Sequence, residues 1–240
     1  MAPLTNRSGS SHFPAGILLL AAVATLSIPL LMLFADRPLA LAMEHLPVRF
    51  RNFAGEITNL GKSLGWLLLS AGLAVFWAVC ARRTQQDPPT SSKHRRRALA
   101  AIFFFAAIAL SGILANLIKL IVGRSRPKQF LADGFYAFEP WHLDVDLRAF
   151  PSGHATTVFA LAFAVAMIRP AWRWPAFVFA IVISATRIII NAHYLSDVIG
   201  GLVVALMTVL WLRYLFDRYG WSFLPSRDLP GNVQKPSTAP

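Results

Sequence analysis

Residues 186–197 read TRIIINAHYLSD and bring three ionisable side chains, Arg187, His193 and Asp197, into an otherwise apolar part of the chain. Ionisable groups at bilayer depth cost roughly 2.5 to 3.5 kcal/mol each on insertion scales, so they usually face a bundle interior or a watery cavity. His193 and Asp197 are four residues apart, a spacing that places them on one face of a helix. A carboxylate there holds an imidazole in one tautomer and stabilises its protonated form. The same pattern also suits a structural ion pair or hydrogen-bond network between two helices.

The composition of the whole chain is typical of a membrane protein. Of 240 residues, 56% are hydrophobic, with 18 Phe and 7 Trp, and only 14% are charged, which is too apolar for an ordinary soluble domain. Six apolar stretches approach or exceed the roughly 17 residues that a spanning helix needs. They cover residues 15–34, 64–81, 98–122, 153–168, 174–192 and 197–216. The sequence therefore predicts an all-α fold, a six-transmembrane helix bundle, over residues 15–220.

Three segments differ in composition from the core of this bundle. The first apolar stretch has about 20 residues, longer than the 7 to 15 of a signal peptide's apolar region, so we expect an anchor rather than a cleaved signal. Residues 35–63 show no clean period and are expected to form a short helix at the membrane interface. Residues 1–14 are expected to be a tail, as are residues 221–240, whose Pro, Ser and Gly content favours disorder.

The net charge of +12 is compatible with nucleic acid, a membrane surface or an anionic substrate. Its distribution favours the membrane. Basic residues gather in the link 82–97, which also holds Asp87, Pro88 and Pro89 and is expected to be a solvated polar loop. By the positive-inside rule, this link and both termini are expected in the cytoplasm, and the loop 123–152 outside. We expect no nucleic-acid partner.

Four cations lie within ten residues at the end of the third apolar stretch: Lys119, Arg124, Arg126 and Lys128. They would repel one another unless an anion lay among them. The alternative is that these side chains extend to the lipid headgroups, as basic residues at membrane helix ends commonly do.

The fourth apolar stretch begins with Pro151, Ser152, Gly153 and His154. A helix that starts this way presents free backbone N–H groups and the positive end of its dipole to an anion. Ser152 also suits an N-cap, and His154 a hydrogen bond to a headgroup.

With six spans and internal termini, seven of these residues fall at one membrane face. They are Lys119, Arg126, Ser152, His154, Arg187, His193 and Asp197. Cations for phosphate oxygens, an in-line nucleophile and an acid for the leaving group are the parts that phosphoryl transfer needs. The sequence has no acidic cluster or His/Cys set with metal-ligand spacing. We therefore expect charge stabilisation from Lys and Arg, with no metal and no other cofactor.

The three motifs together resemble the signature of the type 2 phosphatidic acid phosphatase family, the membrane-bound lipid phosphate phosphatases related to vanadium haloperoxidases. Six residues separate Lys119 from Arg126-Pro127, and the segment 151–154 follows. Five residues then separate Arg187 from His193, and three separate His193 from Asp197. The third motif usually opens Ser-Arg, whereas here Thr186 precedes the arginine.

This resemblance implies a role for each residue. His193 would be the nucleophile that forms a phosphohistidine, oriented by Asp197, and His154 the acid that protonates the departing alcohol. The remaining matched positions would hold the phosphate oxygens: Lys119, Arg126, Ser152, Gly153 and Arg187. Water would then release inorganic phosphate.

The expected substrate is a membrane lipid phosphate in a bacterial inner membrane, with the site on the outer side. Phosphatidic acid, phosphatidylglycerophosphate, undecaprenyl pyrophosphate and lipid A 1-phosphate all fit. The aromatic and acidic loop 129–149 is expected to influence headgroup choice. The alternative is a non-hydrolytic lipid-phosphate binding or transport protein with the same cationic pocket. Haloperoxidase chemistry is disfavoured by the six apolar spans. The sequence leaves the oligomeric state open.

Overall fold

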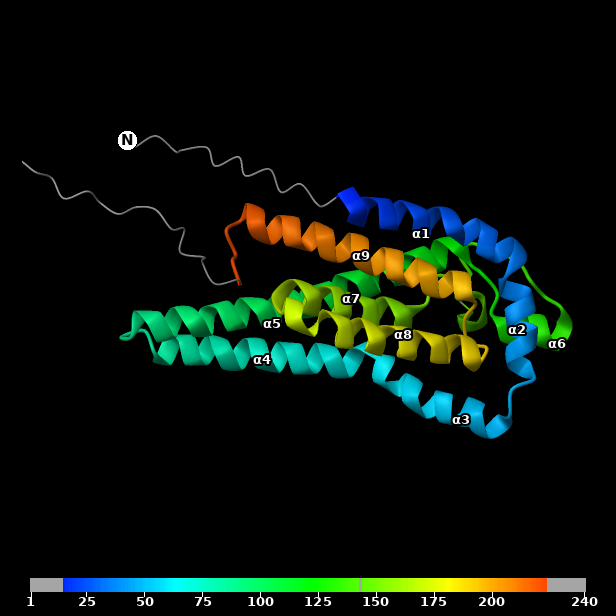
Figure 1. The fold of residues 1–240 in the computed structure, drawn as a ribbon, viewed down its shortest axis with the longest axis horizontal. Coiled ribbons are helices and arrows are strands. Elements are labelled where there is room, and N and C mark those ends of the chain that lie inside the picture. The colour runs from blue at the N-terminus through cyan, green and yellow to red at the C-terminus, as the bar shows by residue number, and fades with distance from the viewer. Residues whose placement is uncertain (1–14, 143, 224–240) are drawn as a thin grey trace, which may run out of the picture.

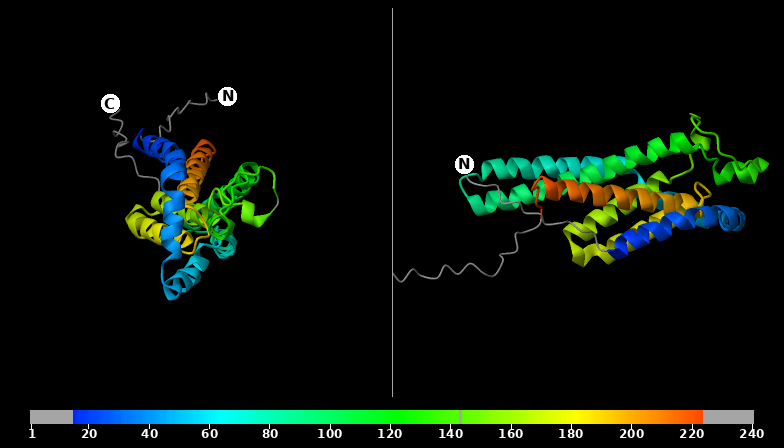
Figure 2. Two further views of the ribbon diagram at one scale, coloured as in Figure 1. Left: turned by 90° about the vertical axis from the view of Figure 1, so that its right-hand side faces the viewer. Right: turned by 90° about the horizontal axis from the view of Figure 1, so that it is seen from above.

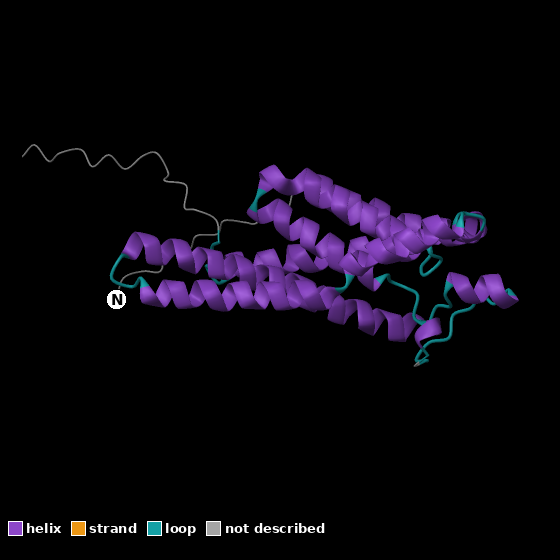
Figure 3. Ribbon diagram, turned by 90° about the horizontal axis from the view of Figure 1, so that it is seen from below, coloured by secondary structure: helices purple, strands orange, loops and turns teal. Residues whose placement is uncertain are grey.

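The computed structural model describes residues 15–142 and 144–223, and over these residues it contains helices but no strand (Figure 3). The elements are α1 (Ala15–Phe34), α2 (Asp36–Glu44), α3 (Val48–Ile57), the 3₁₀ turn η1 (Thr58–Gly61), α4 (Ser63–Arg83), α5 (Pro88–Val122), α6 (Pro127–Asp133), the 3₁₀ turn η2 (Val145–Leu147), α7 (Gly153–Ile168), the 3₁₀ turn η3 (Pro170–Trp172), α8 (Arg173–Ile189) and α9 (Leu195–Arg218). The all-α prediction is confirmed. The predicted tail 1–14, and residues 224–240 of the other tail, lie outside the described residues.

Six long helices lie along one common direction, and the short helices α2, α3 and α6 gather at one end of them (Figure 1). Helix α2 crosses that end and connects α1 to α3, as the end-on view in Figure 2 shows. The long helices α1, α4, α5, α7, α8 and α9 correspond to the six apolar stretches, most with boundaries shifted by only a few residues.

Five segments of the described chain are long and apolar enough to cross a membrane: 15–34, 48–83, 88–122, 170–189 and 195–218. Helix α7 has 16 residues, or about 24 Å at 1.5 Å per residue, which is shorter than the roughly 30 Å bilayer core. It packs against α5, α8 and α9. The six-helix prediction therefore holds approximately, and its shortest member is the central helix.

Small side chains allow the other helices to approach α7 closely. Ala155, Ala160, Ala162 and Ala164 are completely buried, and small residues are what membrane helices use at tight contacts. A Cβ atom added to Gly201 of α9 would lie 2.8 Å from the carbonyl oxygen of Ser152. The sequence thus favours direct contact between the backbones of α7 and α9.

The outer helices carry large apolar side chains on their exposed surfaces. Leu26 and Leu33 of α1 are each 73% exposed, and Leu64 and Leu68 of α4 are about as open. Contiguous apolar surface of this extent is unusual on a soluble monomer. It indicates that α1 and α4 face lipid.

The prediction of a polar loop over residues 82–97 is wrong for most of that segment. Helix α5 starts at Pro88, so that only residues 84–87 lie between α4 and α5. Proline suits the first turn of a helix because its missing N–H would have no partner there. The extended part of α5 packs on α4, with the guanidinium of Arg97 4.4 Å from the ring centroid of Trp77.

The segment 35–63 forms two helices and a 3₁₀ turn rather than one short interfacial helix. Ala40 of α2 and Ala54 of α3 are each 3% exposed. Helix α2 contacts α6, α8 and α9, and α3 contacts α8. The segment therefore covers the end of the bundle at which the predicted site residues lie.

Candidate active site

All eight predicted site residues lie at the end of the bundle that α2 crosses. Lys119 is in the last turn of α5 and Arg126 directly precedes α6. Ser152, Gly153 and His154 form the start of α7. Arg187 lies in the last turn of α8, Asp197 in the first turn of α9, and His193 between these two helices. Five helix ends therefore bring distant parts of the sequence to one place.

His193 and Asp197 face each other in the interior of this cluster. Nδ1 of His193 lies 3.6 Å from Oδ2 of Asp197, and the two side chains are 3% and 0% exposed. The same Oδ2 accepts a hydrogen bond of 2.8 Å from the backbone N–H of Tyr194. Because Nδ1 faces the carboxylate, Nε2 is the ring nitrogen that remains for a substrate. Burial lowers the pKa of His193 to about 3, although Asp197 opposes this shift, so the imidazole is neutral at pH 7.

Two of the cations around this pair, Lys119 and Arg187, donate to neutral acceptors. Lys119 Nζ donates to the carbonyl of Arg148 over 2.9 Å, and Arg187 Nη1 donates to the hydroxyl of Thr58 over 3.0 Å. Lys119 interacts electrostatically with Arg126, Arg148 and Arg187. Several positive charges at close range are strongly favourable only when an anion binds among them.

Four buried polar atoms of the predicted site have no hydrogen-bond partner among the described residues. They are Ser152 Oγ, His154 Nε2, Arg187 Nε and His193 Nδ1. Buried polar atoms are nearly always paired, and leaving one without a partner costs about 1 to 3 kcal/mol. Phosphate oxygens would supply acceptors to the hydroxyl and to the guanidinium. This part of the site therefore fits a multiply charged oxyanion.

A hollow of about 390 Å³ opens beside His154, between the beginning of α4, the α5 helix and the beginning of α7. Lys62, Asn116 and Thr157 are among its lining residues. Gly61 leaves room for the imidazole, because a Cβ atom on Gly61 would lie 2.9 Å from Cδ2 of His154. The hollow therefore gives a small molecule access to the imidazole of His154.

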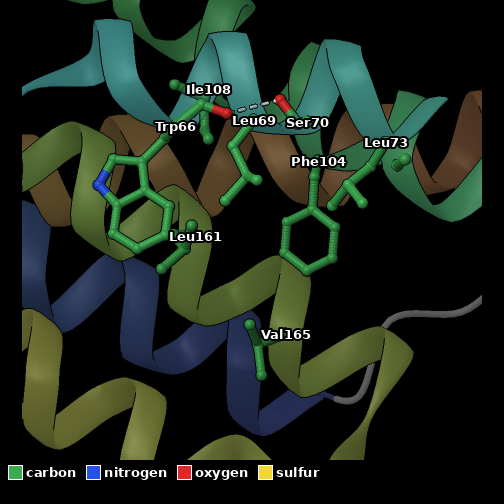
Figure 4. Close-up of a pocket in the computed structure, with 9 residues that line it drawn as sticks. Trp66, Leu69, Ser70, Leu73, Phe104, Ile108, Leu161 and Val165 are labelled. Carbon is green, nitrogen blue, oxygen red and sulfur yellow. Dashed lines mark hydrogen bonds between the residues drawn. The ribbon is translucent and has the colours of Figure 1, made fainter. Parts of the chain in front are cut away.

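An apolar cavity of about 220 Å³ lies farther along the same three helices (Figure 4). Its lining includes Ile108 of α5 and Leu161 of α7. Each lies four residues, or about one helical turn, from a residue of the first hollow, namely Gly112 and Thr157. The hydroxyl of Ser70 is turned to the carbonyl of Trp66 over 2.7 Å, so the cavity surface is apolar. Both hollows lie between α4, α5 and α7, about one helical turn apart, and together they are called the groove.

Residues 100–221 match the PAP2 superfamily, and this window contains all eight predicted site residues. The chain belongs to the PAP2 superfamily. The family inferred from the three motifs is therefore confirmed.

Several relatives of this PAP2-superfamily protein have names that describe phosphatases of membrane lipids. It is 32% identical over 193 residues to a lipid A 1-phosphatase of Rhizobium johnstonii, covering 80% of this chain and 78% of the relative. It is 31% identical over 121 residues to the undecaprenyl-diphosphatase BcrC of Bacillus subtilis, covering 50% and 58%. In fold it resembles the crystal structure of a transmembrane PAP2 type phosphatidylglycerolphosphate phosphatase from Bacillus subtilis, with a TM-score of 0.53 and 19% identity over 85% of this chain and 96% of that one.

The substitution in the third motif of this PAP2-superfamily protein has a simple structural outcome. The hydroxyl of Thr186 donates to the carbonyl of Ile183 over 2.6 Å, within α8. Threonine commonly makes such a bond to its own helix. The hydroxyl is therefore engaged with the α8 backbone.

Arg124 was missed as a site residue by the sequence analysis of this PAP2-superfamily protein. It is completely buried and donates to Asp197 over 2.5 Å and to Asp36 over 2.7 Å. Although burial opposes its charge, Asp197 and Asp36 raise the pKa of Arg124 above its usual value. The sequence analysis expected an anion among the four clustered cations. For Arg124 that anion is the pair of carboxylates of Asp36 and Asp197. Lys128 is exposed instead.

Asp36 and Thr58 were also missed. Both lie in the segment 35–63, to which the sequence analysis assigned no functional residue. Thr58 accepts from Arg187, and Asp36 from Arg124. The available signal for Asp36 was its position, because it is a carboxylate that closely follows the first apolar stretch. Such a residue is expensive to bury unless it is paired.

Proposed function

We propose that this protein is an integral membrane lipid phosphatase that cleaves a phosphomonoester or pyrophosphate of a membrane lipid through a phosphohistidine, without a metal. The observation that carries the proposal is the set of unpaired buried polar atoms among cations around His193. This arrangement lies at one end of a bundle of apolar helices. The lipid phosphatase relatives support the same activity.

In the first step, Nε2 of His193 attacks the phosphorus atom and the bond to the lipid oxygen breaks. Protonated His154 gives its proton to that oxygen, and the lipid leaves as an alcohol from a phosphomonoester or as a lipid monophosphate from a pyrophosphate. Asp197, beside Nδ1, stabilises the positive charge that develops on the ring of His193. Lys119, Arg126 and Arg187, with Ser152 and Gly153, hold the phosphate oxygens and neutralise their charge.

In the second step, water attacks the phosphorus atom of the phosphohistidine. The neutral imidazole of His154 accepts a proton from this water. The nitrogen–phosphorus bond breaks, inorganic phosphate leaves and His193 is neutral again. The two histidines therefore have different tasks, nucleophile and proton carrier.

The groove from His154 along α4, α5 and α7 supports a lipid as the leaving group. Its polar mouth adjoins the catalytic residues, and its apolar part contains Trp66, Phe104 and Leu161 (Figure 4). Burying apolar surface stabilises a complex by about 25 cal/mol per Å². A hydrocarbon chain in this groove would hold the phosphate at the cationic end.

The 1-phosphate of lipid A is the first substrate to test. The lipid A 1-phosphatase of Rhizobium johnstonii aligns with 80% of this chain, whereas the undecaprenyl-diphosphatase BcrC aligns with 50%. We also propose a bacterial inner-membrane location, with both termini in the cytoplasm and the site on the outer side. The charge distribution supports this orientation.

The deciding experiment is phosphate release by the purified protein in detergent and chelator. The substrates are lipid A 1-phosphate, undecaprenyl pyrophosphate, phosphatidylglycerophosphate and phosphatidic acid, with His193→Ala as the control. We expect release from at least one lipid and none from the variant. No release from any of them by folded protein would favour the non-hydrolytic binding or transport function. Release that requires added metal would contradict the cationic mechanism.

A further inference from the structure

Asp36 is a buried carboxylate at the start of α2, 1% exposed, with partners on two distant elements. Its Oδ2 accepts from Nη2 of Arg124 over 2.7 Å. Its Oδ1 accepts from the backbone N–H of Ser196 over 3.1 Å, and its Oδ2 also accepts from the Ser196 hydroxyl. Asp36 therefore connects Arg124 to the first turn of α9, which carries Asp197.

Arg124 is shared between two carboxylates. Nη1 donates to Asp197 Oδ1 over 2.5 Å, and Nη2 donates to Asp36. All three side chains are completely buried, where charges are poorly screened and each one needs a partner. One guanidinium and two carboxylates leave one net negative charge in this group.

That negative charge is placed where the reaction needs it. Asp197 Oδ1 faces Arg124, whereas Oδ2 faces His193. If Arg124 had Asp197 as its only carboxylate partner, the pair would be neutral and little charge would act on the imidazole. With Asp36 also bound, Arg124 neutralises only part of Asp197.

We propose that Asp36 is a positioning residue for the catalytic pair: by sharing Arg124 and holding the start of α9, it leaves Asp197 charged toward His193. This inference rests on the proposed function. When the imidazole gains a phosphoryl group and becomes cationic, the net charge of the buried group balances it. Asp36 acts through Arg124 and Ser196, and it does not hold the phosphate.

The first test is Asp36→Asn, which keeps the size of the side chain and an oxygen for the Ser196 N–H. We expect kcat to fall about 10- to 100-fold, the usual effect of losing a group that orients a reactive side chain. KM should change less than about threefold, because the phosphate-binding cations remain. Inhibition by inorganic phosphate should also be unchanged. The matched control is Glu56→Gln on the neighbouring helix α3, whose side chain is exposed.

The second test separates charge from structure. Adding Arg124→Gln to Asp36→Asn restores one net negative charge, that of Asp197. The charge account predicts that kcat of the double variant is at least about threefold higher than that of Asp36→Asn. A structural account predicts a further loss, since the bonds of Arg124 to Ser196, Asp197 and Tyr136 are broken as well.

The outcomes are distinct. Wild-type kcat in Asp36→Asn would overturn the proposal, as would a rise in KM comparable with the fall in kcat. A double variant slower than Asp36→Asn would overturn the charge account. Failure of Asp36→Asn to fold, judged by elution and thermal unfolding in detergent, would assign Asp36 a purely structural role. Absence of phosphate release by the wild type is a different result and contradicts the proposed function itself.

Discussion

The buried pair of His193 and Asp197 shows how one carboxylate meets several demands. Asp197 binds Arg124 through one oxygen, and through the other it accepts from the Tyr194 backbone and faces His193. These contacts fix the carboxylate, and with it the ring orientation of the histidine. The proposed nucleophile is therefore oriented before a substrate arrives, which is how enzymes reduce the reorganisation needed in the transition state.

The two members of this pair should differ in how severely their loss affects turnover. His193→Ala removes the nucleophile and should lower kcat below about one-thousandth of the wild-type value. Asp197→Asn should lower kcat about 10²- to 10⁴-fold, since the nucleophile stays while its orientation and charge stabilisation are lost. Single-turnover phosphate release with both variants measures the difference. Equal residual rates above one-tenth of wild type would contradict the assignment.

The low pKa of His193, about 3, has a consequence for stability. Between pH 6.5 and 3 the unfolded chain binds a proton at this position that the folded protein does not, so stability falls as the pH falls. At pH 5 the loss is about 2 kcal/mol, from 1.36 kcal/mol per pH unit below 6.5. Thermal unfolding in detergent at pH 7.5 and pH 5 should show a smaller decrease for His193→Gln than for the wild type. An equal decrease would show that His193 is protonated in the folded state.

Helices α7 and α9 owe the position of the site to the contact between their backbones. The Ser152 N–H donates to the Asp197 carbonyl over 2.9 Å, and Gly201 lies against the Ser152 carbonyl. Helix separation therefore determines how the start of α7, with its proposed phosphate-binding residues, faces the carboxylate of Asp197. A shift of about 1 Å between these helices is enough to reduce catalysis strongly.

Gly201→Ala tests this contact. The new methyl group would lie 2.8 Å from a backbone oxygen, so α7 and α9 must separate, and overpacking of this kind costs about 1 to 3 kcal/mol. We expect a lower Tm and at least about tenfold lower kcat. In the control, Gly72→Ala on α4, the added atom meets nothing within 4 Å. Alanine is the better helix former, so this variant should be at least as stable as wild type.

The groove between α4, α5 and α7 should control affinity for the lipid chain. Leu161→Trp fills the apolar cavity and should raise KM about tenfold for a long-chain lipid phosphate. Hydrolysis of a short-chain, water-soluble analogue should change less than about twofold, because the catalytic residues are untouched. Leu68→Trp is the matched control, since Leu68 is 65% exposed on the lipid-facing side of α4. Equal effects on both substrates would mean that the hydrocarbon chain of the lipid does not bind in this cavity.

The whole molecule has its proposed catalytic chemistry at one end and a dense set of basic residues at the other. The α4–α5 turn and the preceding end of α4 carry Arg82 and Arg83, whereas Lys119 and Arg187 lie at the end that α2 crosses (Figure 1). Under the positive-inside rule the turn is cytoplasmic and the site faces outward. The enzyme would then serve lipids of the outer leaflet.

Labelling of single cysteines in intact cells tests this orientation. With Cys80 replaced by Ser, a cysteine at Gln86 in the α4–α5 turn should resist a membrane-impermeant maleimide. A cysteine at Asp133, exposed near the site end, should react. The reverse pattern would place the site in the cytoplasm, and reaction at both positions would mean that the cells had lost their barrier.

The sequence by itself determined the membrane class, the approximate ends of six apolar helices and the spacing of three motifs. These are local properties, because a span depends on about 20 consecutive side chains and each motif on residues within one or two turns. It also misassigned residues 88–97, since a charged helix beyond the membrane has the composition of a loop.

Only the tertiary structure decided the partners of the catalytic residues. Asp36 and Arg124 are 88 positions apart, and Thr58 and Arg187 are 129 apart. No local pattern encodes such pairs. They form because α2, η1 and the ends of α5, α8 and α9 pack together, and because a buried charge is stable only where packing brings it an opposite charge or a hydrogen-bond partner.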